Sequence, residues 1–161
     1  MEIQDYQYIS FILDLLDIDE IKKLKEFEHH RITNRLYHSI DVSYKSYLIA
    51  KKFGLKTESL RAVSRAGLLH DLFYYDTKIE KHKKHLSTHP EIAVKNAEKI
   101  CDLTDRERDI IISHMFGVSF KHIPKYKESF IVSMVDKAVS INEVFNRVKK
   151  KRKNIYLKFA Q

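Results

Sequence analysis

Six residues of types that bind metal ions stand inside apolar stretches or at the ends of expected helices. They are His38, His70, Asp71, His89, His114 and Asp136. In AGLLHDLFYY, His70 and Asp71 interrupt a nearly continuous apolar run, and Asp136 does the same in FIVSMVDKAVSI. A buried carboxylate is costly without a partner. The chain must therefore compensate these two aspartates, either with Arg or Lys or with a metal ion.

The histidines decide between these two forms of compensation. His114 follows three isoleucines in DIIISHMF, and His38 shares a helix face with Val42 and Ile49. A single buried histidine is usually a hydrogen-bonded core residue, but several of them beside buried carboxylates favour a metal. Mixed imidazole and carboxylate ligands suit Fe, Mn, Co or Zn. The sequence therefore indicates a metal site inside the fold.

Apolar residues recur at helical spacing along most of the chain, and this periodicity predicts seven helices. They span Tyr6–Asp17, Ile18–His30, Asn34–Phe53, Thr57–Tyr75, Pro90–Asp102, Thr104 to near Gly117, and Lys127 to about Lys150. Thr57 is the expected N-cap of the fourth helix, and Pro90 the first residue of the fifth. Thr104 and Glu107 have capping-box spacing at the start of the sixth. Because only 3 Gly and 2 Pro are present, turn chemistry for a many-stranded β fold is lacking, and we expect an all-α protein.

The chain has 161 residues, of which 43% are hydrophobic and 32% charged, as in a globular protein. We expect a single domain over 1–161, with its core at about 33–145 and a basic tail at 149–161. The formal net charge of +8 indicates either a solvated basic surface or an anionic partner. The run KKKRK in the tail is either a solvated helix end or a nucleic-acid contact.

The single cysteine, Cys101, excludes an intramolecular disulfide and a Cys-based zinc motif. The first residues, MEIQDYQYIS, lack a basic n-region, and no run of 18 apolar residues occurs. We therefore expect a cytoplasmic protein without a membrane partner. The sequence does not indicate an oligomeric state.

The order His … His-Asp … Asp resembles the signature of the HD-domain superfamily. The surrounding strings are similar as well: LYHSIDVS around His38, AGLLHDLFYYD around the His-Asp pair, and SMVDKAV around Asp136. The stretches HLSTHPEIAVKNAE and IIISHMF resemble segments of HD proteins that hold a second metal. The resemblance covers roughly 33–145 and extends to small stand-alone HD proteins. The Gly-Tyr-Pro motif of cyclic-di-GMP phosphodiesterases is absent, which disfavours that substrate.

The resemblance implies a compact α-helical bundle with its metal in the middle. The ligands that it implies for a first divalent ion are His38, His70, Asp71 and Asp136. Those that it implies for a second ion are His89 and His114, with Asp71 bridging. Fe or Mn is favoured, and Zn, Co, Ni or Mg would also be compatible.

Several side chains near this set have two interpretations. Lys137 either meets a substrate phosphate or lies at the surface, and His85 faces either the site or solvent. His89 either binds metal or caps its helix. We assign Asp71 and Lys137 as catalytic residues, and His85 and Lys137 as substrate contacts. Arg65 is expected to be a structural ion-pair partner.

Three functions are compatible with these residues. The first is a phosphohydrolase acting on a phosphate ester or nucleotide, in which metal-activated water attacks phosphorus. The second is a di-iron oxygenase, because some HD proteins use the same six-residue set to activate dioxygen. The third is a non-catalytic, metal-stabilised module that binds a nucleotide or nucleic acid. We expect the hydrolase with an anionic small-molecule substrate, and nucleic acid is not favoured.

Overall fold

The computed structural model describes residues 5–29, 33–75 and 85–159. Within them the chain forms seven α-helices, one short 3-10 helix and one pair of two-residue strands. The α-helices are α1 (Tyr6–Leu16), α2 (Asp19–Lys22), α3 (Arg35–Lys52), α4 (Thr57–Leu69), α5 (His85–Ala97), α6 (Asp105–Ser113) and α7 (Lys127–Phe159). The remaining elements are η1 (Lys23–Glu26), β1 (Glu28–His29) and β2 (Thr33–Asn34). The protein is all-α, as expected.

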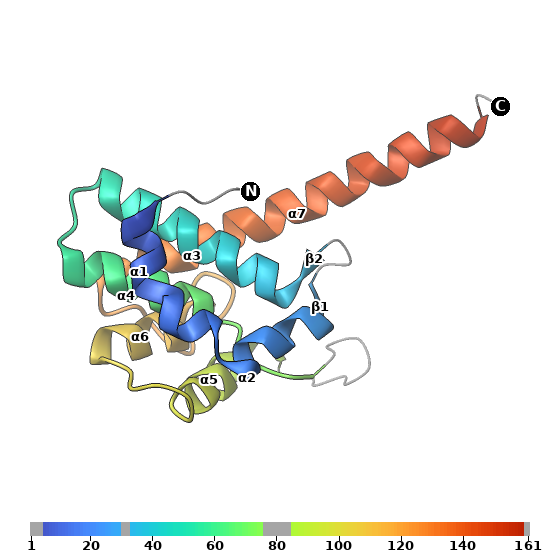
Figure 1. Ribbon diagram of the computed structural model, residues 1–161. Coiled ribbons are helices and arrows are strands. Elements are labelled where there is room, and N and C mark those ends of the chain that lie inside the picture. The colour runs from blue at the N-terminus through green and yellow to red at the C-terminus, as the bar shows by residue number, and fades with distance from the viewer. Residues whose placement is uncertain (1–4, 30–32, 76–84, 160–161) are drawn as a thin grey trace.

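Helix α4 lies at the centre of the fold and contacts α1, α3, α5, α6 and α7 (Figure 1). Gly67 allows its closest approach to α3, because a Cβ at this position would lie 2.8 Å from the Cα of Ser43. Beside this contact the Ser43 hydroxyl donates to the carbonyl of Ser64. Helix α4 thus packs closely against α3 near its C-terminal end, and this contact fixes the positions of His70 and Asp71, which follow at the end of α4.

The N-terminal part of the fold packs on this pair through α1. The guanidinium of Arg65 lies 2.7 Å from Asp14 of α1 and 3.4 Å from the buried carboxylate of Glu107 on α6. This confirms the structural ion-pair role predicted for Arg65. Thr104 and Glu107 also form the capping box predicted for α6.

The predicted second helix over Ile18–His30 is wrong. The chain forms α2 and η1, and then turns extended at Phe27, because β1 pairs with β2 in antiparallel register. The predicted cap at Thr57 is also wrong. Lys56 is the extended residue that precedes α4, it makes no side-chain capping bond, and Thr57 is already helical.

The expected ends of three further helices differ from the structure. Helix α4 ends at Leu69 and not at Tyr75, with His70 as its C-cap. Helix α6 likewise ends at Ser113, with His114 as its C-cap. Helix α5 runs from His85 to Ala97 and not from Pro90 to Asp102. Pro90 is thus its sixth residue, where a proline removes the helical hydrogen bond to the carbonyl four residues earlier.

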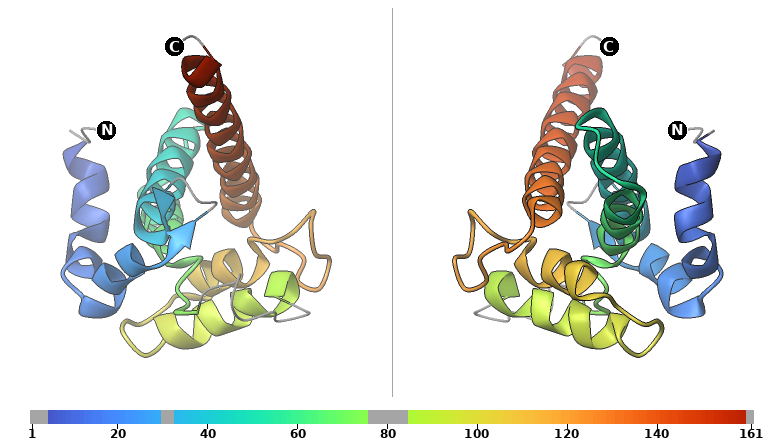
Figure 2. Two further views of the ribbon diagram at one scale, coloured as in Figure 1. Left: turned by 90° about the vertical axis from the view of Figure 1, so that its right-hand side faces the viewer. Right: turned by 90° about the vertical axis from the view of Figure 1, so that its left-hand side faces the viewer.

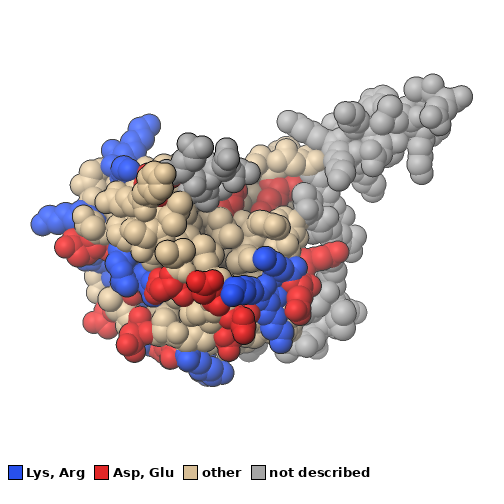
Figure 3. Space-filling view, viewed as in Figure 1, with Lys and Arg blue, Asp and Glu red and all other residues tan. Residues whose placement is uncertain are grey.

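Helix α7 is longer than predicted, since it continues to Phe159. Its first half packs against α3, α4 and α6, whereas its second half runs past the rest of the molecule (Figures 1 and 2). Among the described residues, no helix combines the length and apolar character that crossing a membrane requires. On the face drawn in Figure 3, acidic and basic side chains are interspersed over the body.

Candidate metal centre

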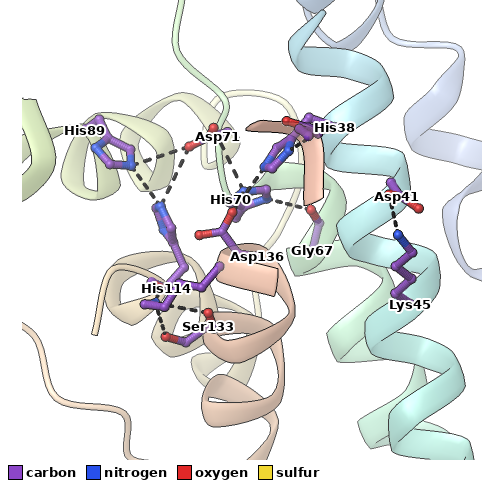
Figure 4. A network of polar contacts seen from close by, with 12 residues as sticks. His38, Asp41, Lys45, Gly67, His70, Asp71, His89, His114, Ser133 and Asp136 are labelled. Carbon is purple, nitrogen blue, oxygen red and sulfur yellow. Dashed lines mark hydrogen bonds and ion pairs between the residues drawn. The ribbon is translucent and has the colours of Figure 1, made fainter. Parts of the chain in front are cut away.

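All six metal-binding candidates are buried and lie close together where five helices meet (Figure 4). The residues concerned are His38 of α3, His70 and Asp71 at the end of α4, His89 of α5, His114 at the end of α6, and Asp136 of α7. None of them exposes more than 8% of its surface. Side chains from 38 to 136 in the sequence therefore share one polar interior.

The first group of possible ligands combines His38, His70 and Asp136, whose donor atoms lie within 4.8 Å of one another. The Oδ1 of Asp136 is 3.1 Å from Nε2 of His38 and 3.6 Å from Nε2 of His70. One carboxylate oxygen thus faces two imidazole nitrogens, a geometry that one cation could occupy.

The second group combines His70, Asp71 and His114. Oδ2 of Asp71 lies 3.9 Å from Nε2 of His70, and Oδ1 lies 3.7 Å from Nε2 of His114. His89 adjoins this group, because its Nε2 is 3.4 Å from Oδ1 of Asp71 and 2.8 Å from Nε2 of His114. The Asp71 carboxylate therefore stands between the two halves of the cluster, and His70 belongs to both groups.

The backbone sets the tautomers of two histidines. Nδ1 of His70 donates to the carbonyl of Gly67 at 2.8 Å, and Nδ1 of His114 donates to the carbonyl of Ile111 at 2.7 Å. Both residues are helix C-caps, where carbonyls of the last turn lack helical partners and can accept such bonds. Each ring consequently turns the lone pair of Nε2 toward the interior, in the form that binds a metal.

His38 lies within α3, and a side chain provides its partner. Its Nδ1 is 3.1 Å from Oε1 of Glu143 on α7. Glu143 was missed by the sequence interpretation, although it follows Asp136 by seven residues and therefore lies on the same face of α7. A carboxylate behind a metal-binding histidine fixes the orientation of the ring.

The electrostatics of the cluster are those of charges held in a buried site. Burial opposes the charge on His38, but its contacts with Asp136 and Glu143 raise the pKa of His38 to about 10. Burial likewise opposes the charge on Asp136, yet the hydrogen bond with His38 and the nearby imidazole of His70 hold its pKa well below the usual value. Burial and neighbouring imidazoles lower the pKa of His114 to about 3. The centre therefore holds a proton where a cation could stand.

The donor set fits a divalent metal ion. Within the described part of the chain, Nε2 of His70 is buried and has no hydrogen-bond partner. It nevertheless lies within 4 Å of carboxylate oxygens of Asp71 and Asp136. A buried polar atom without a partner is costly, and a cation bound by this nitrogen and these oxygens would remove that cost.

Lys137 follows Asp136 but is turned toward the end of α6. Its ammonium donates to the carbonyl of His114 at 3.0 Å, and to the carbonyl and hydroxyl of Ser133 at 3.0 and 2.8 Å. Burial lowers the pKa of Lys137, an effect that the charge of Asp136 opposes. These contacts use the three donors of the ammonium group, and they tie the backbone at His114 to α7.

Two sequence predictions cannot be traced in this geometry. The side chain of His85 lies outside the described residues, although its backbone opens α5. The side chains of the basic tail are likewise not described. The ring of His89, for which a capping role was the alternative, lies with Asp71 and His114 (Figure 4).

A buried arginine fixes the segment that follows the His-Asp pair. Arg35 donates from Nη1 to the carbonyl of Phe73 at 2.6 Å and from Nη2 to that of Tyr75 at 3.3 Å. Its guanidinium also stacks over the Phe73 ring, 3.6 Å from the centroid. The start of α3 thus holds the chain just beyond Asp71, a support that the sequence interpretation did not foresee.

Comparison with known proteins gives one match. The family model described as the HD domain matches residues 35–140, a span that includes all six buried candidates. No curated protein and no solved structure matches the chain.

Proposed function

Because the chain belongs to the HD-domain family, we propose that it is a metal-dependent phosphohydrolase acting on a phosphate ester or nucleotide. The observation that carries this proposal is the buried cluster with an unpartnered Nε2 on His70 between two carboxylates. We propose that one or two divalent ions bind there, with Fe or Mn favoured. A second ion is supported by His89 and His114, whose Nε2 atoms lie beside Oδ1 of Asp71 and provide donors in addition to those of the first group.

Bound divalent cations would supply Lewis acidity and a water whose pKa is near neutral. The chain's own part is to hold neutral imidazoles and two carboxylates at fixed positions. Because two carboxylates only partly balance two divalent ions, the loaded centre would keep a net charge of about +2. Such a centre attracts an anionic substrate and favours a phosphate over a neutral compound.

Asp71 has the central role in this proposal, since its two oxygens face opposite halves of the cluster. We assign Lys137 to the substrate phosphate, which it would reach by exchanging a hydrogen bond with Ser133 for one with a phosphate oxygen. We assign His85 to the substrate as well, because it lies one helical turn before His89 on α5.

Metal analysis of anaerobically purified protein, followed by a panel of nucleotides and phosphodiesters, tests the proposal. We expect bound transition metal and release of phosphate or a nucleotide without consumption of dioxygen. Protein that takes up no metal after reconstitution would contradict the metal centre. Turnover that requires dioxygen, with a mixed-valent iron signal in the resting protein, would instead identify an oxygenase.

A further inference from the structure

A second pattern runs along α7, on a face that the metal centre does not use. Apolar residues recur in α7 at alternating spacings of three and four, which is the spacing of a coiled-coil seam. The seam positions are Ile131, Met134, Ala138, Ile141, Phe145, Val148, Arg152, Ile155 and Phe159. Eight of these nine positions are apolar, and the pattern continues over the part of α7 that runs past the body (Figures 1 and 2). A repeat of this length is typical of helices that pair with one another.

From Met134 onward the described part of this seam faces away from the body, whereas Ile131 is partly buried against the core. Met134 is 65% exposed, Ile141 57% and Phe145 63%. Phe130 and Val144, which border the seam, are 45% and 43% exposed. Monomeric proteins rarely leave so many large apolar side chains together at the surface.

The opposite face of the same helix is occupied by the body. Val132 and Val139 are buried in the core, and Asp136 is buried in the metal centre. Glu143 contacts His38. Rotating α7 to cover the exposed seam would therefore expose these core and metal-centre residues.

The surface beside the seam is also apolar and concave. A groove of about 300 Å³ lies between α3 and α7 and includes Leu48, Ile49 and Ala138. Leu48 and Ile49 are themselves 41% and 38% exposed. The small side chain of Ala138, the third seam position, would let the backbone of another helix approach closely.

We infer that this surface binds the same surface of a second copy of the chain, so that two α7 helices form an antiparallel coiled coil. A seam on one helix is self-complementary under a twofold axis, as homodimers require. If position 141 lies opposite position 145 of the other copy, then 138 faces 148, 134 faces 152, and 131 faces 155. All described seam positions then have an opposing seam position.

Charge selects the antiparallel arrangement. Residues 127–143 carry two lysines and three carboxylates, for a net charge of −1. Residues 144–159 carry seven Lys and Arg and no acidic residue. A parallel pair would place two strongly basic halves side by side, which is unfavourable. An antiparallel pair separates the two basic halves. The carboxylates of residues 127–143 do not face the seam, since Glu128 and Asp136 are buried and Glu143 contacts His38, so the arrangement is selected by repulsion between the basic halves.

Sedimentation and light scattering of the full chain test the association. We expect a mass twice the 19.2 kDa of one chain, and we expect Ile141→Asp and Phe145→Asp each to shift the protein to monomer at the same concentration. Leu13→Asp is the matched control, since Leu13 is a helical residue with the same 57% exposure, and it should leave the dimer intact. Retained helical circular dichroism shows that the seam variants still fold.

Cross-linking tests the direction. In a Cys101→Ser background, Met134→Cys in one copy should form a disulfide with Arg152→Cys in a differently tagged copy, and neither variant should cross-link efficiently with itself. A monomeric wild-type protein would overturn the inference, as would a dimer that persists in both seam variants. Self-cross-linking of Met134→Cys would overturn the antiparallel arrangement.

Discussion

Glu143 and His38 are linked across α7 and α3, with Oε1 of the carboxylate 3.1 Å from Nδ1 of the imidazole. The other nitrogen of the same ring, Nε2, lies 3.1 Å from Oδ1 of Asp136. One helix thus provides both a possible metal ligand and the group that orients the neighbouring ligand. His70 and His114 obtain the same support from carbonyls of their own helices.

Removing the Glu143 carboxylate should weaken metal binding without removing a ligand. We expect Glu143→Ala to lower the affinity for Zn²⁺ or Mn²⁺ by about 10- to 100-fold, the usual effect of losing such a partner. Glu143→Gln keeps an acceptor for the Nδ1 proton and should recover most of the affinity. Competition with a coloured chelator measures both variants.

Asp41→Asn is the control for this experiment. Asp41 lies on α3 close to His38 in sequence, but it pairs with Lys45 and points away from the cluster (Figure 4). It should bind metal as the wild type does. Equal affinity in the wild type and Glu143→Ala would show that the ring needs no carboxylate behind it.

Asp71→Ala should abolish metal binding and turnover together. Asp71 is the carboxylate that faces both halves of the cluster, so its loss would remove negative charge from each. We expect the metal content of Asp71→Ala to be lower than that of any variant that lacks a single histidine. Elemental analysis after dialysis measures this content. Full metal content in this variant would place the centre elsewhere.

Metal affinity should rise with pH. His38 must be neutral to bind an ion, and its pKa is raised to about 10 in the metal-free protein. Binding near pH 7 therefore displaces a proton, and affinity should increase by up to about tenfold per pH unit between pH 7 and 9. Calorimetry in buffers of different ionisation enthalpy measures the proton release. Metal affinity that stays constant from pH 7 to 9 would mean that His38 is already neutral.

The same raised pKa affects the stability of the metal-free fold, with a defined sign. Because the pKa of His38 is higher in the folded chain than its usual value near 6.5, the protonated ring stabilises the fold below pH 6.5. This stabilisation is lost as the pH rises toward 10.

Gly67→Ala should destabilise the protein although it replaces no proposed metal ligand. Its new Cβ would lie 2.8 Å from the backbone of Ser43, so α3 and α4 would have to move apart. We expect a loss of about 1–3 kcal/mol in the free energy of unfolding, as for other overpacked contacts. Urea denaturation measures it, with the exposed Glu58→Ala of the same helix as the control. No loss would mean that the two helices adjust freely.

The sequence predicted the helical fold and the six clustered residues because both depend on local patterns. Polar side chains in apolar runs, such as His70 and Asp136, identified the buried cluster, and Thr104 with Glu107 identified a helix start. The HD match over residues 35–140 agrees with the family resemblance.

Features that depend on distant partners could not be predicted in this way. The pairing of β1 with β2 ends a helix pattern that looks continuous in the sequence. Glu143 has no local mark that distinguishes it from a surface glutamate, since its role depends on α3 lying beside α7. The direction of Lys137 depends on the end of α6 in the same way.

The metal-binding candidates come from distant parts of the chain, and this separation affects how a bound ion would stabilise the fold. His38 and Asp136 are separated by 98 positions, and helices α4, α5 and α6 contribute between them. An ion bound by these side chains would act as a cross-link that closes a long loop, and such a link removes entropy from the unfolded chain. This chain has one cysteine and no disulfide to serve that purpose. Its melting temperature would then report the concentration of free metal around it.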